Sequence, residues 1–368
     1  MKVLYQTNIP NPYVVDFFNL LGKKCELTVL YERHFAKDRD KKWVGGSAKN
    51  YKEIYLRGKN IGSENSFCPS IIKYIKGDYD HIIIGDYSTY TAMWAIRYMR
   101  RHKIPYILST DGGFANYEES NIKKRLKTYL IGGASKWLSP GGLSNEYLIH
   151  YGAVAERITE YPFTSLGEED ILSSPIELEE KKKIRESLGI NCDVMIIGVG
   201  QFIYRKGWDV LASALKAGLF DTSKETHLDI QAYIIGGEKE KLEELVGMLP
   251  KNLHAIPFVS KKELFEYYKA ADIFALPTRE DIWGLVVNEA MACGLPVITT
   301  DRCNAGISLV EDNVNGYIVP KDDEVKLKEA VERLAYDDNL REEMSRHNLE
   351  KILKYTYQNK VESYISAL

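Results

Sequence analysis

Residues 270–300, which read AADIFALPTREDIWGLVVNEAMACGLPVITT, constrain the fold more than any other stretch of the chain. Short apolar runs at 272–276 and 296–300 predict two buried strands, and the apolar-polar pattern at 284–293, closed by Gly294, predicts a helix between them. A polar loop, residues 277–283, follows the first strand. The stretch therefore predicts one βαβ unit of a parallel sheet, with an acidic loop at its mouth.

Two features of this unit indicate ligand binding. The loop ends on Glu280 and Asp281 where the helix begins, and open α/β sheets bind ligands beyond the carboxyl ends of their strands. Glu289 follows about one helical turn further on. A phosphate could bind to the unpaired backbone N–H groups of the first helical turn, those of Gly284, Leu285 and Val286. From these residues alone, capping of the helix by Glu280 and Asp281 is the simpler interpretation.

The run DIWGLVVNEAMACGLPV, which begins at Asp281, resembles the signature of the retaining glycosyltransferases of family 4, which have the GT-B fold. The family has an acidic residue, seven residues and then a Glu. Here these are Asp281 and Glu289, with Asp where the family most often has Glu. The resemblance implies that Asp281 holds the donor sugar as a catalytic residue and that Glu289 binds the ribose. It extends through most of the C-terminal half and more weakly through the N-terminal half.

A second motif lies after the strand expected at residues 193–200. Ile203 stands where a dinucleotide fingerprint needs Gly, so that interpretation is rejected. The segment resembles the family's G-R-x-x-x-x-K-G loop, whose Arg and Lys hold the donor diphosphate. Lys206 matches the Lys, Gln201 occupies the position of the Arg, and Arg205 is expected to supply the missing charge. Phe258, in a strand expected at residues 254–259, falls where the family cradles the nucleotide base.

The N-terminal half alternates strands expected at 2–7, 25–31, 81–86 and 104–110 with helices expected at 13–21, 69–76 and 89–102, which predicts a second doubly wound parallel sheet. Asp111 follows the fourth strand and precedes Gly112 and Gly113. It falls where the family often has a His that faces the donor sugar, so the resemblance implies a catalytic position. An Asp-Gly pair is also a common turn.

A length of 368 residues suits two α/β domains. The resemblance implies a GT-B architecture of two Rossmann-like, doubly wound parallel-sheet domains that face a central cleft. We expect an N-terminal acceptor-side domain at residues 1–165, a C-terminal nucleotide-sugar-binding domain at 175–355, and a C-terminal helix at 356–368 that crosses back. The polar segment 161–174 is the expected linker.

Charge is distributed unevenly along the chain. Residues 1–160 carry 24 Lys and Arg against 16 Asp and Glu, and the remainder carries 25 against 36, so a net charge of −3 divides into +8 and −11. A basic, aromatic insertion at residues 32–62 shows no regular pattern and fits either the acceptor side of the cleft or a solvated loop. The expected helix 121–131 holds Lys123, Lys124, Arg125 and Lys127. Basic segments of this kind predict peripheral contact with an anionic membrane.

The sequence does not contain the motifs that are typical of several other enzyme classes. There is no D-x-D after a buried strand, no H-E-x-x-H, no nucleophile elbow and no Walker A motif. The five cysteines are scattered, no apolar run approaches a membrane span, and the N-terminus has no signal-peptide profile. We therefore expect a cytoplasmic protein that contacts the inner face of the membrane peripherally, with no metal, no other cofactor and no nucleic acid partner.

The predicted function is transfer of a hexose from a nucleoside diphosphate sugar, with UDP-sugar favoured, to a hydroxyl of a glycan or lipid-linked saccharide acceptor in cell-surface polysaccharide biosynthesis. Two alternatives stay open: a catalytically inactive accessory subunit of GT-B shape, and a sugar-nucleotide epimerase of the same architecture.

Overall fold

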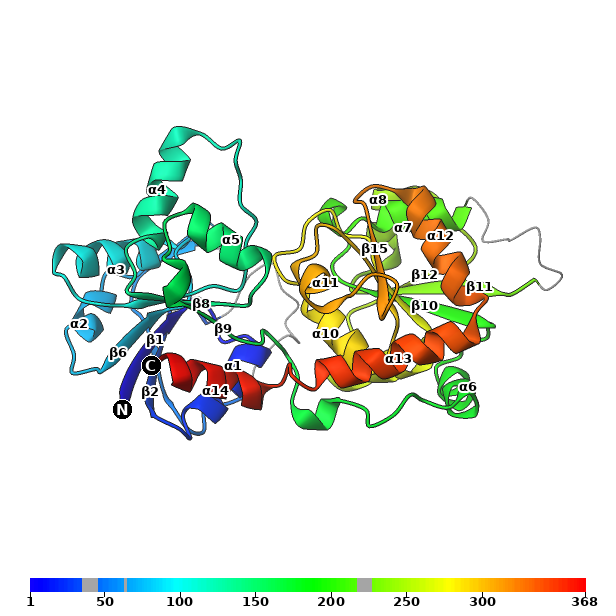
Figure 1. The fold of residues 1–368 in the computed structure, drawn as a ribbon, viewed down its shortest axis with the longest axis horizontal. Helices are drawn as coiled ribbons and strands as arrows, with labels where there is room; N and C mark the ends of the chain where they lie inside the picture. The colour runs from blue at the N-terminus through cyan, green and yellow to red at the C-terminus, as the bar shows by residue number, and fades with distance from the viewer. Residues whose placement is uncertain (35–45, 63–64, 217–226) are drawn as a thin grey trace. The chain divides into compact units, whose positions relative to one another are not determined.

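The computed structural model describes residues 1–34, 46–62, 65–216 and 227–368 (Figure 1). The described chain divides into two compact units: unit 1 comprises Met1–Thr164 and Thr356–Leu368, and unit 2 comprises Ser165–Tyr355. Each unit is built on one parallel sheet with helices packed against it, so the predicted α/β class is confirmed. Within the described ranges, no helix is both long enough and apolar enough to cross a membrane.

Unit 1 contains a seven-stranded sheet in the order β3-β2-β1-β6-β7-β8-β9, in which every neighbouring pair is parallel. The strands are β1 (Lys2–Thr7), β2 (Glu26–Tyr31), β3 (Lys52–Tyr55), β6 (His81–Ile84), β7 (Ile107–Ser109), β8 (Lys136–Ser139) and β9 (Ile158–Glu160). The helices are α1 (Pro12–Leu21), α2 (Ile71–Ile75), α3 (Tyr90–Arg101), α4 (Asn121–Ile131), α5 (Leu143–His150) and α14 (Tyr357–Ala367). A separate antiparallel hairpin joins β4 (Lys59–Ile61) to β5 (Asn65–Phe67).

The local sequence explains these elements. The central strands bury consecutive residues, Val3–Gln6 in β1 and Ile82–Ile84 in β6, as expected for strands covered by helices on both faces. Helix α3 begins after Thr89, whose side chain accepts a hydrogen bond from the backbone N–H of Ala92. Its buried residues, Thr91, Ala92, Ala95, Ile96 and Met99, recur at helical spacing and join the core of the unit.

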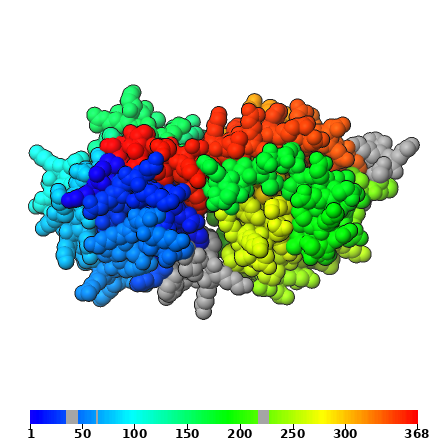
Figure 2. Space-filling model, turned by 90° about the horizontal axis from the view of Figure 1, so that it is seen from below, coloured from blue at the N-terminus to red at the C-terminus, as the bar shows by residue number. Residues whose placement is uncertain are grey.

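The C-terminal helix α14 belongs to unit 1 although unit 2 separates it from the rest of that unit in the sequence. It packs against α1, where Lys24 forms an ion pair with Glu362 at 2.9 Å. The hydroxyl of Tyr364 lies 2.7 Å from that of Ser109, which ties the helix to the end of β7. Figure 2 shows the red C-terminal residues beside the blue N-terminal ones.

Unit 2 contains a six-stranded parallel sheet in the order β12-β11-β10-β13-β14-β15. The strands are β10 (Val194–Val199), β11 (Ile230–Ile235), β12 (Leu253–Ile256), β13 (Ile273–Leu276), β14 (Val297–Thr300) and β15 (Gly316–Val319). The helices are α6 (Leu178–Ser187), α7 (Trp208–Lys216), α8 (Lys239–Val246), α9 (Lys261–Ala270), α10 (Leu285–Ala292), α11 (Asn304–Leu309), α12 (Glu324–Ala335) and α13 (Asp338–Ile352). Short 3-10 turns occur at Ala155–Arg157, Glu168–Asp170 and Tyr204–Lys206.

Helix α6 is held to the sheet by charge, because its only buried residue is Arg185. The guanidinium of Arg185 pairs with Asp272 at the start of β13 and donates from Nε to the carbonyl of Ala270 at 2.8 Å. Lys181 adds a second cation 3.2 Å from the same carboxylate. The two cations hold the pKa of Asp272 below its usual value despite burial.

Three details of the sequence interpretation need correction. The stretch 32–62 is not without regular structure, because it contains β3 and β4; its residues 35–45, with Lys37, Lys41 and Trp43, lie outside the described residues. The strand expected at 254–259 ends at Ile256, so Phe258 lies in the following loop. The segment after β14, for which the sequence analysis named no helix, turns into the short helix α11 at Asn304. Hydrophobic periodicity does not detect strands and helices this short, because their formation depends on contacts with residues distant in the sequence.

Candidate functional site

The candidate site lies at the carboxyl edge of the unit 2 sheet. Strands β10 and β13 are neighbours at the centre of the sheet. The chain after β10 continues to β11 on one side, and the chain after β13 continues to β14 on the other side. Such a switch point leaves a crevice between the two loops, and ligands of doubly wound sheets bind there. The loop after β10 carries Gln201, Arg205 and Lys206, and the loop after β13 carries Asp281. The topology therefore brings both sequence motifs together.

Lys206 and Asp281 form an ion pair at the centre of this site. The Nζ atom of Lys206 lies 2.5 Å from Oδ2 of Asp281, and the two side chains are only 11% and 13% exposed. Arg205 is more exposed; its Nη1 lies 3.8 Å from Oδ1 of Asp281 and donates to the carbonyl of Glu280 at 2.6 Å. One carboxylate thus faces both cations that the sequence analysis assigned to a diphosphate.

A glycine allows the two loops to approach this closely. Gly207 has φ +70, and a Cβ added there would lie 1.9 Å from the carbonyl oxygen of Pro277. Any other residue would push the loop after β10 away from the end of β13. Thr278 holds the contact, because its hydroxyl donates to the carbonyl of Arg205 at 2.9 Å.

Arg279, which the sequence analysis did not identify, fastens the same loops together. Its guanidinium donates to both carboxylate oxygens of Asp209 at 2.8 and 2.7 Å and, from Nε, to Asp322 at 2.6 Å. It also lies 3.8 Å above the ring of Tyr204, and its backbone N–H donates to the carbonyl of Arg205 at 2.8 Å. Two parallel hydrogen bonds of this kind fix the orientation of the Arg279 guanidinium as well as its distance from Asp209. Arg279 therefore holds the backbone that presents Arg205.

The N-terminus of α10 supplies backbone donors beside Asp281. Gly284 precedes the helix with φ 102, and a Cβ there would lie 2.9 Å from Sγ of Cys303. Across the part of the chain that the structure describes, no acceptor pairs with the backbone N–H groups of Gly284, Leu285 or Val286. Unpaired N–H groups and the positive end of the helix dipole favour an anion at this position.

Glu289 lies on α10 and is held by two hydroxyls. Its carboxylate accepts from Oγ of Ser165 at 2.8 Å and from the hydroxyl of Tyr268 at 3.2 Å. Burial raises the pKa of Glu289, while the two hydrogen bonds and the positive charge of Lys261 act in the opposite sense. Ser165 and Tyr268 are further residues of the site that no motif revealed.

Gln201 and Phe258 lie at the same edge of the sheet. The carbonyl of Gln201 accepts from Nε1 of the buried Trp208 at 3.0 Å, so this loop is anchored by the residue that opens α7. Phe258 is half-buried between the end of β12 and Ser260, which caps α9 through reciprocal hydrogen bonds with Glu263.

Asp111 lies in unit 1, in the loop after β7, and is exposed. The charged group that acts on it most strongly is Lys360 of α14, which sequence reasoning missed. Lys360 is 3% exposed, and its Nζ lies 4.5, 4.7 and 5.1 Å from the ring centres of Phe17, Phe163 and Tyr161. Burial lowers the pKa of Lys360 to about 8, and Asp111 acts in the opposite sense.

Comparison with known proteins was made on sequence and on structure. Residues 180–351 match the family described as "Glycosyl transferases group 1". A D-inositol 3-phosphate glycosyltransferase of Xylanimonas cellulosilytica is 30% identical over 206 residues, which cover 52% of this chain and 46% of that protein. The chain thus spans about half the length of the curated relatives that it matches.

Solved structures resemble the whole chain. Anabaena Alr3699/HepE in complex with UDP superposes with a TM-score of 0.76 at 16% identity, covering 100% of this chain and 99% of that one. WaaG, a glycosyltransferase involved in lipopolysaccharide biosynthesis, gives a TM-score of 0.70 at 16% identity, with coverage of 99% and 98%. The predicted GT-B fold is confirmed, because both sheets match those of such enzymes.

Proposed function

We propose that this protein is a retaining glycosyltransferase of family 4. It transfers a hexose from a nucleoside diphosphate sugar to a hydroxyl of a glycan or lipid-linked saccharide acceptor. The observation that carries the proposal is the arrangement around Lys206 and Asp281, where two cations, a carboxylate and a free helix N-terminus converge at the switch point of a glycosyl transferases group 1 domain.

Each group has a role that follows from its chemistry. A departing nucleoside diphosphate gains negative charge as the glycosidic bond breaks. Lys206, Arg205 and the N–H groups at the start of α10 stabilise that charge, and they act most strongly in the transition state. When the diphosphate pairs with Lys206, Asp281 is released to accept hydrogen bonds from the donor sugar. Glu289, fixed by Ser165 and Tyr268, binds the ribose hydroxyls.

The remaining predicted residues complete the donor and acceptor sides. Gln201 lies in the loop after β10, beside the diphosphate, and Phe258 contacts the nucleotide base. Asp111, in unit 1, takes the catalytic position that the family often gives to His and interacts with the reacting sugar.

UDP is the favoured nucleotide, and cell-surface polysaccharide the favoured product. The HepE structure in complex with UDP supports the first choice. The role of WaaG in lipopolysaccharide biosynthesis supports the second. Against an inactive accessory subunit stands the presence of Lys206, Asp281 and Glu289 together at the carboxyl edge of the unit 2 sheet, where ligands of doubly wound sheets bind.

A peripheral position on an anionic membrane, at its cytoplasmic face, is also proposed. Helix α4 carries Lys123, Lys124 and Arg125 on its exposed surface, beside apolar side chains that face solvent. Basic amphipathic helices of this composition bind anionic lipid surfaces.

The proposal is tested by a panel of UDP-, GDP- and ADP-sugars in a thermal-shift assay, followed by transfer assays with the sugar that stabilises most. A ligand at 100 times its Kd adds about 2.7 kcal/mol. Lys206→Ala should weaken donor binding and lower kcat/KM, whereas Lys326→Ala, which removes an exposed lysine of α12 from the same unit, should change neither. NMR of the product's anomeric proton tests retention. Transfer by Lys206→Ala at the parental kcat/KM would refute the site.

A further inference from the structure

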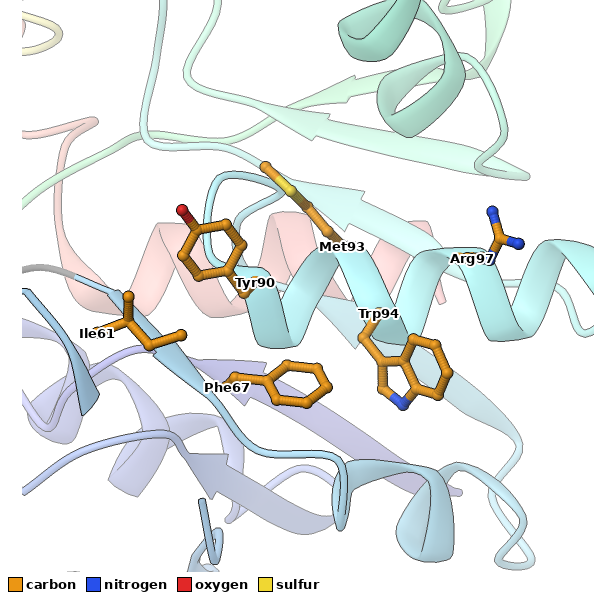
Figure 3. A pocket seen from close by; sticks show the side chains of 6 residues that line it. All are labelled: Ile61, Phe67, Tyr90, Met93, Trp94 and Arg97. Carbon is orange, nitrogen blue, oxygen red and sulfur yellow. The ribbon is translucent and has the colours of Figure 1, made fainter. Parts of the chain in front are cut away.

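An apolar groove lies on unit 1, between helix α3 and the hairpin of β4 and β5 (Figure 3). It measures about 480 Å3. Its lining consists of Ile61, Phe67, Tyr90, Met93, Trp94 and Arg97. None of these residues has a place in the transfer chemistry proposed above.

The groove exposes three aromatic side chains that lie close together. Phe67 is 37% exposed, Trp94 40% and Tyr90 47%, although each belongs to a regular element. The rings of Phe67 and Trp94 meet edge to face, with centres 6.1 Å apart. In Figure 3, Tyr90, Trp94 and Arg97 project from successive turns of α3, and Phe67 and Ile61 come from the hairpin. Contiguous apolar surface of this kind marks a binding region.

The surroundings of the groove are basic. Helix α3 contributes Arg97, Arg100 and Arg101 and has no acidic residue. Arg100 contacts α4, because its guanidinium lies 4.1 Å from the ring centre of Tyr129 and donates to the carbonyl of that residue. Helix α3, which carries Tyr90, Met93, Trp94 and Arg97 of the groove, is therefore in direct contact with α4.

Helix α4 repeats the combination of apolar and basic groups. It carries four basic residues and no acidic residue; one of the four, Lys127, pairs with Glu119 at 2.9 Å. Ile122, Leu126 and Tyr129 recur at spacings of four and three, so they share one face of the helix, and they are 81%, 48% and 39% exposed. Helix α4 thus presents an apolar stripe to solvent.

We propose that the groove binds an acyl chain of an anionic phospholipid, with Arg97 at the headgroup phosphate and α4 lying in the membrane interface. The inference deepens the membrane contact of the proposed function and rests on it, but it does not depend on the donor site. Helices α3 and α4 carry three and four basic residues; Lys127 is paired with Glu119, and the other six complement a negative lipid surface. The aromatic rings suit the boundary between headgroups and acyl chains.

The polarity of the groove distinguishes a lipid from a glycan. The side-chain groups able to form hydrogen bonds in its lining are the guanidinium of Arg97, the hydroxyl of Tyr90 and the indole N–H of Trp94. A saccharide loses hydrogen bonds with water at every hydroxyl and needs matching partners for them. An acyl chain needs no hydrogen-bond partners, and its binding is favoured because it removes the apolar surface of Phe67 and Met93 from water.

Trp94 provides a direct probe of occupancy. Trp137, Trp208 and Trp283 are at most 3% exposed, and Trp43 lies outside the described residues. In a Trp43→Phe background, the accessible tryptophan fluorescence therefore reports on the groove. Vesicles of phosphatidylglycerol and phosphatidylcholine should shift the emission of Trp94 to the blue, and brominated acyl chains should quench it, whereas vesicles of phosphatidylcholine alone should do neither.

Binding is then measured by co-sedimentation with the full chain. Trp94→Glu should raise the lipid concentration for half-maximal binding at least tenfold without changing transfer to a short soluble acceptor. Phe67→Ser, a milder change, should raise it severalfold. The matched control is Met248→Glu, which places the same charge at an apolar residue of unit 2 that is 86% exposed, and it should have no effect. Circular dichroism confirms that each variant is folded.

Three results would overturn the inference. The first is that the parental protein ignores phosphatidylglycerol vesicles at low salt. The second is that a soluble oligosaccharide, not lipid, shifts the emission of Trp94. The third is that Trp94→Glu binds vesicles like the parent while reversal of Lys123, Lys124 and Arg125 to Glu abolishes binding, since α4 would then act without the groove. Transfer from UDP-sugar is scored separately, so failure of the lipid site and failure of the enzyme assignment are distinguishable.

Discussion

Replacement of Asp281 by Asn separates the two consequences of its contact with Lys206. The carboxylate stands where the diphosphate of a donor would meet the same ammonium group, so it competes with the ligand in the free protein. The amide keeps the shape of the side chain but removes its charge. We expect Asp281→Asn to bind free UDP more tightly, to be less stable without ligand, and to lose transfer.

The magnitudes follow from the geometry of the pair. Removing one partner of a buried ion pair costs about 3 to 5 kcal/mol, and exposures of 11% and 13% place this pair at the lower end, about 3 kcal/mol. A hydrogen bond to a charged group contributes about 1.5 kcal/mol or more, and the diphosphate no longer has to displace it, so the Kd for UDP should fall about tenfold. Loss of a group that contacts the donor sugar should slow transfer by about a hundredfold.

The assay combines thermal melts with and without UDP, calorimetric titration of UDP, and single-turnover transfer. Glu280→Gln is the matched control, because it removes one negative charge from the neighbouring residue, whose exposed carboxylate forms no ion pair in the described structure. The control should melt like the parent and bind UDP within about twofold of it.

A Kd for UDP that is unchanged or higher in Asp281→Asn would refute this reasoning. It would mean that the carboxylate does not occupy the position of the diphosphate, and that Lys206 serves Asp281 as a structural partner only. Normal transfer by the variant would leave helix capping as the role of Asp281.

Three further predictions concern residues around the two sheets. Glu289→Gln should raise KM for the donor more than it lowers kcat in steady-state assays, because ribose contacts are equal in ground and transition states; a defect in kcat alone would contradict the ribose assignment. Arg279→Lys, which loses the bidentate contact with Asp209, should raise donor KM severalfold, and an unchanged KM would show that the loop holds its position without the clamp. Burial and the charge of Asp86 raise the pKa of Glu32 to about 7 from an ordinary 4.5. The folded state therefore keeps a proton that the unfolded chain has lost, and this stabilisation is present below pH 4.5 and disappears as pH rises through 7. Unfolding measured from pH 4.5 to 8 should show the parent losing up to about 3 kcal/mol relative to Glu32→Gln; parallel pH profiles would contradict a raised pKa.

The sequence by itself determined the class of the fold and the identity of most candidate residues. Short apolar runs indicated buried parallel strands, and the helix predicted at 121–131 has the bounds of α4. The stretch after β13 carries Asp281, the start of α10 and Glu289 within nine positions, and a motif this dense needs no tertiary information. The roles of these residues in donor binding stay predictions.

Only the tertiary structure decided which side chains meet. Lys206 and Asp281 are separated by 75 positions, and nothing in either motif says that the acid neutralises the cation. Their contact exists because β10 and β13 are adjacent at the switch point and because Gly207 lets two loops touch. The aromatic contacts of Lys360 likewise require α14 to return to unit 1.

The sequence also did not show which apolar side chains of unit 1 are exposed to solvent. Nothing in the sequence says that Trp94 and Phe67 are partly exposed, whereas the structure leaves their rings, which pack edge to face, 40% and 37% exposed. Ile122 and Leu126 of α4 face solvent, and the spacing of these side chains by itself does not say whether their face of the helix is covered. Periodicity fixes which side chains share a face, but only packing between distant segments decides whether that face is covered.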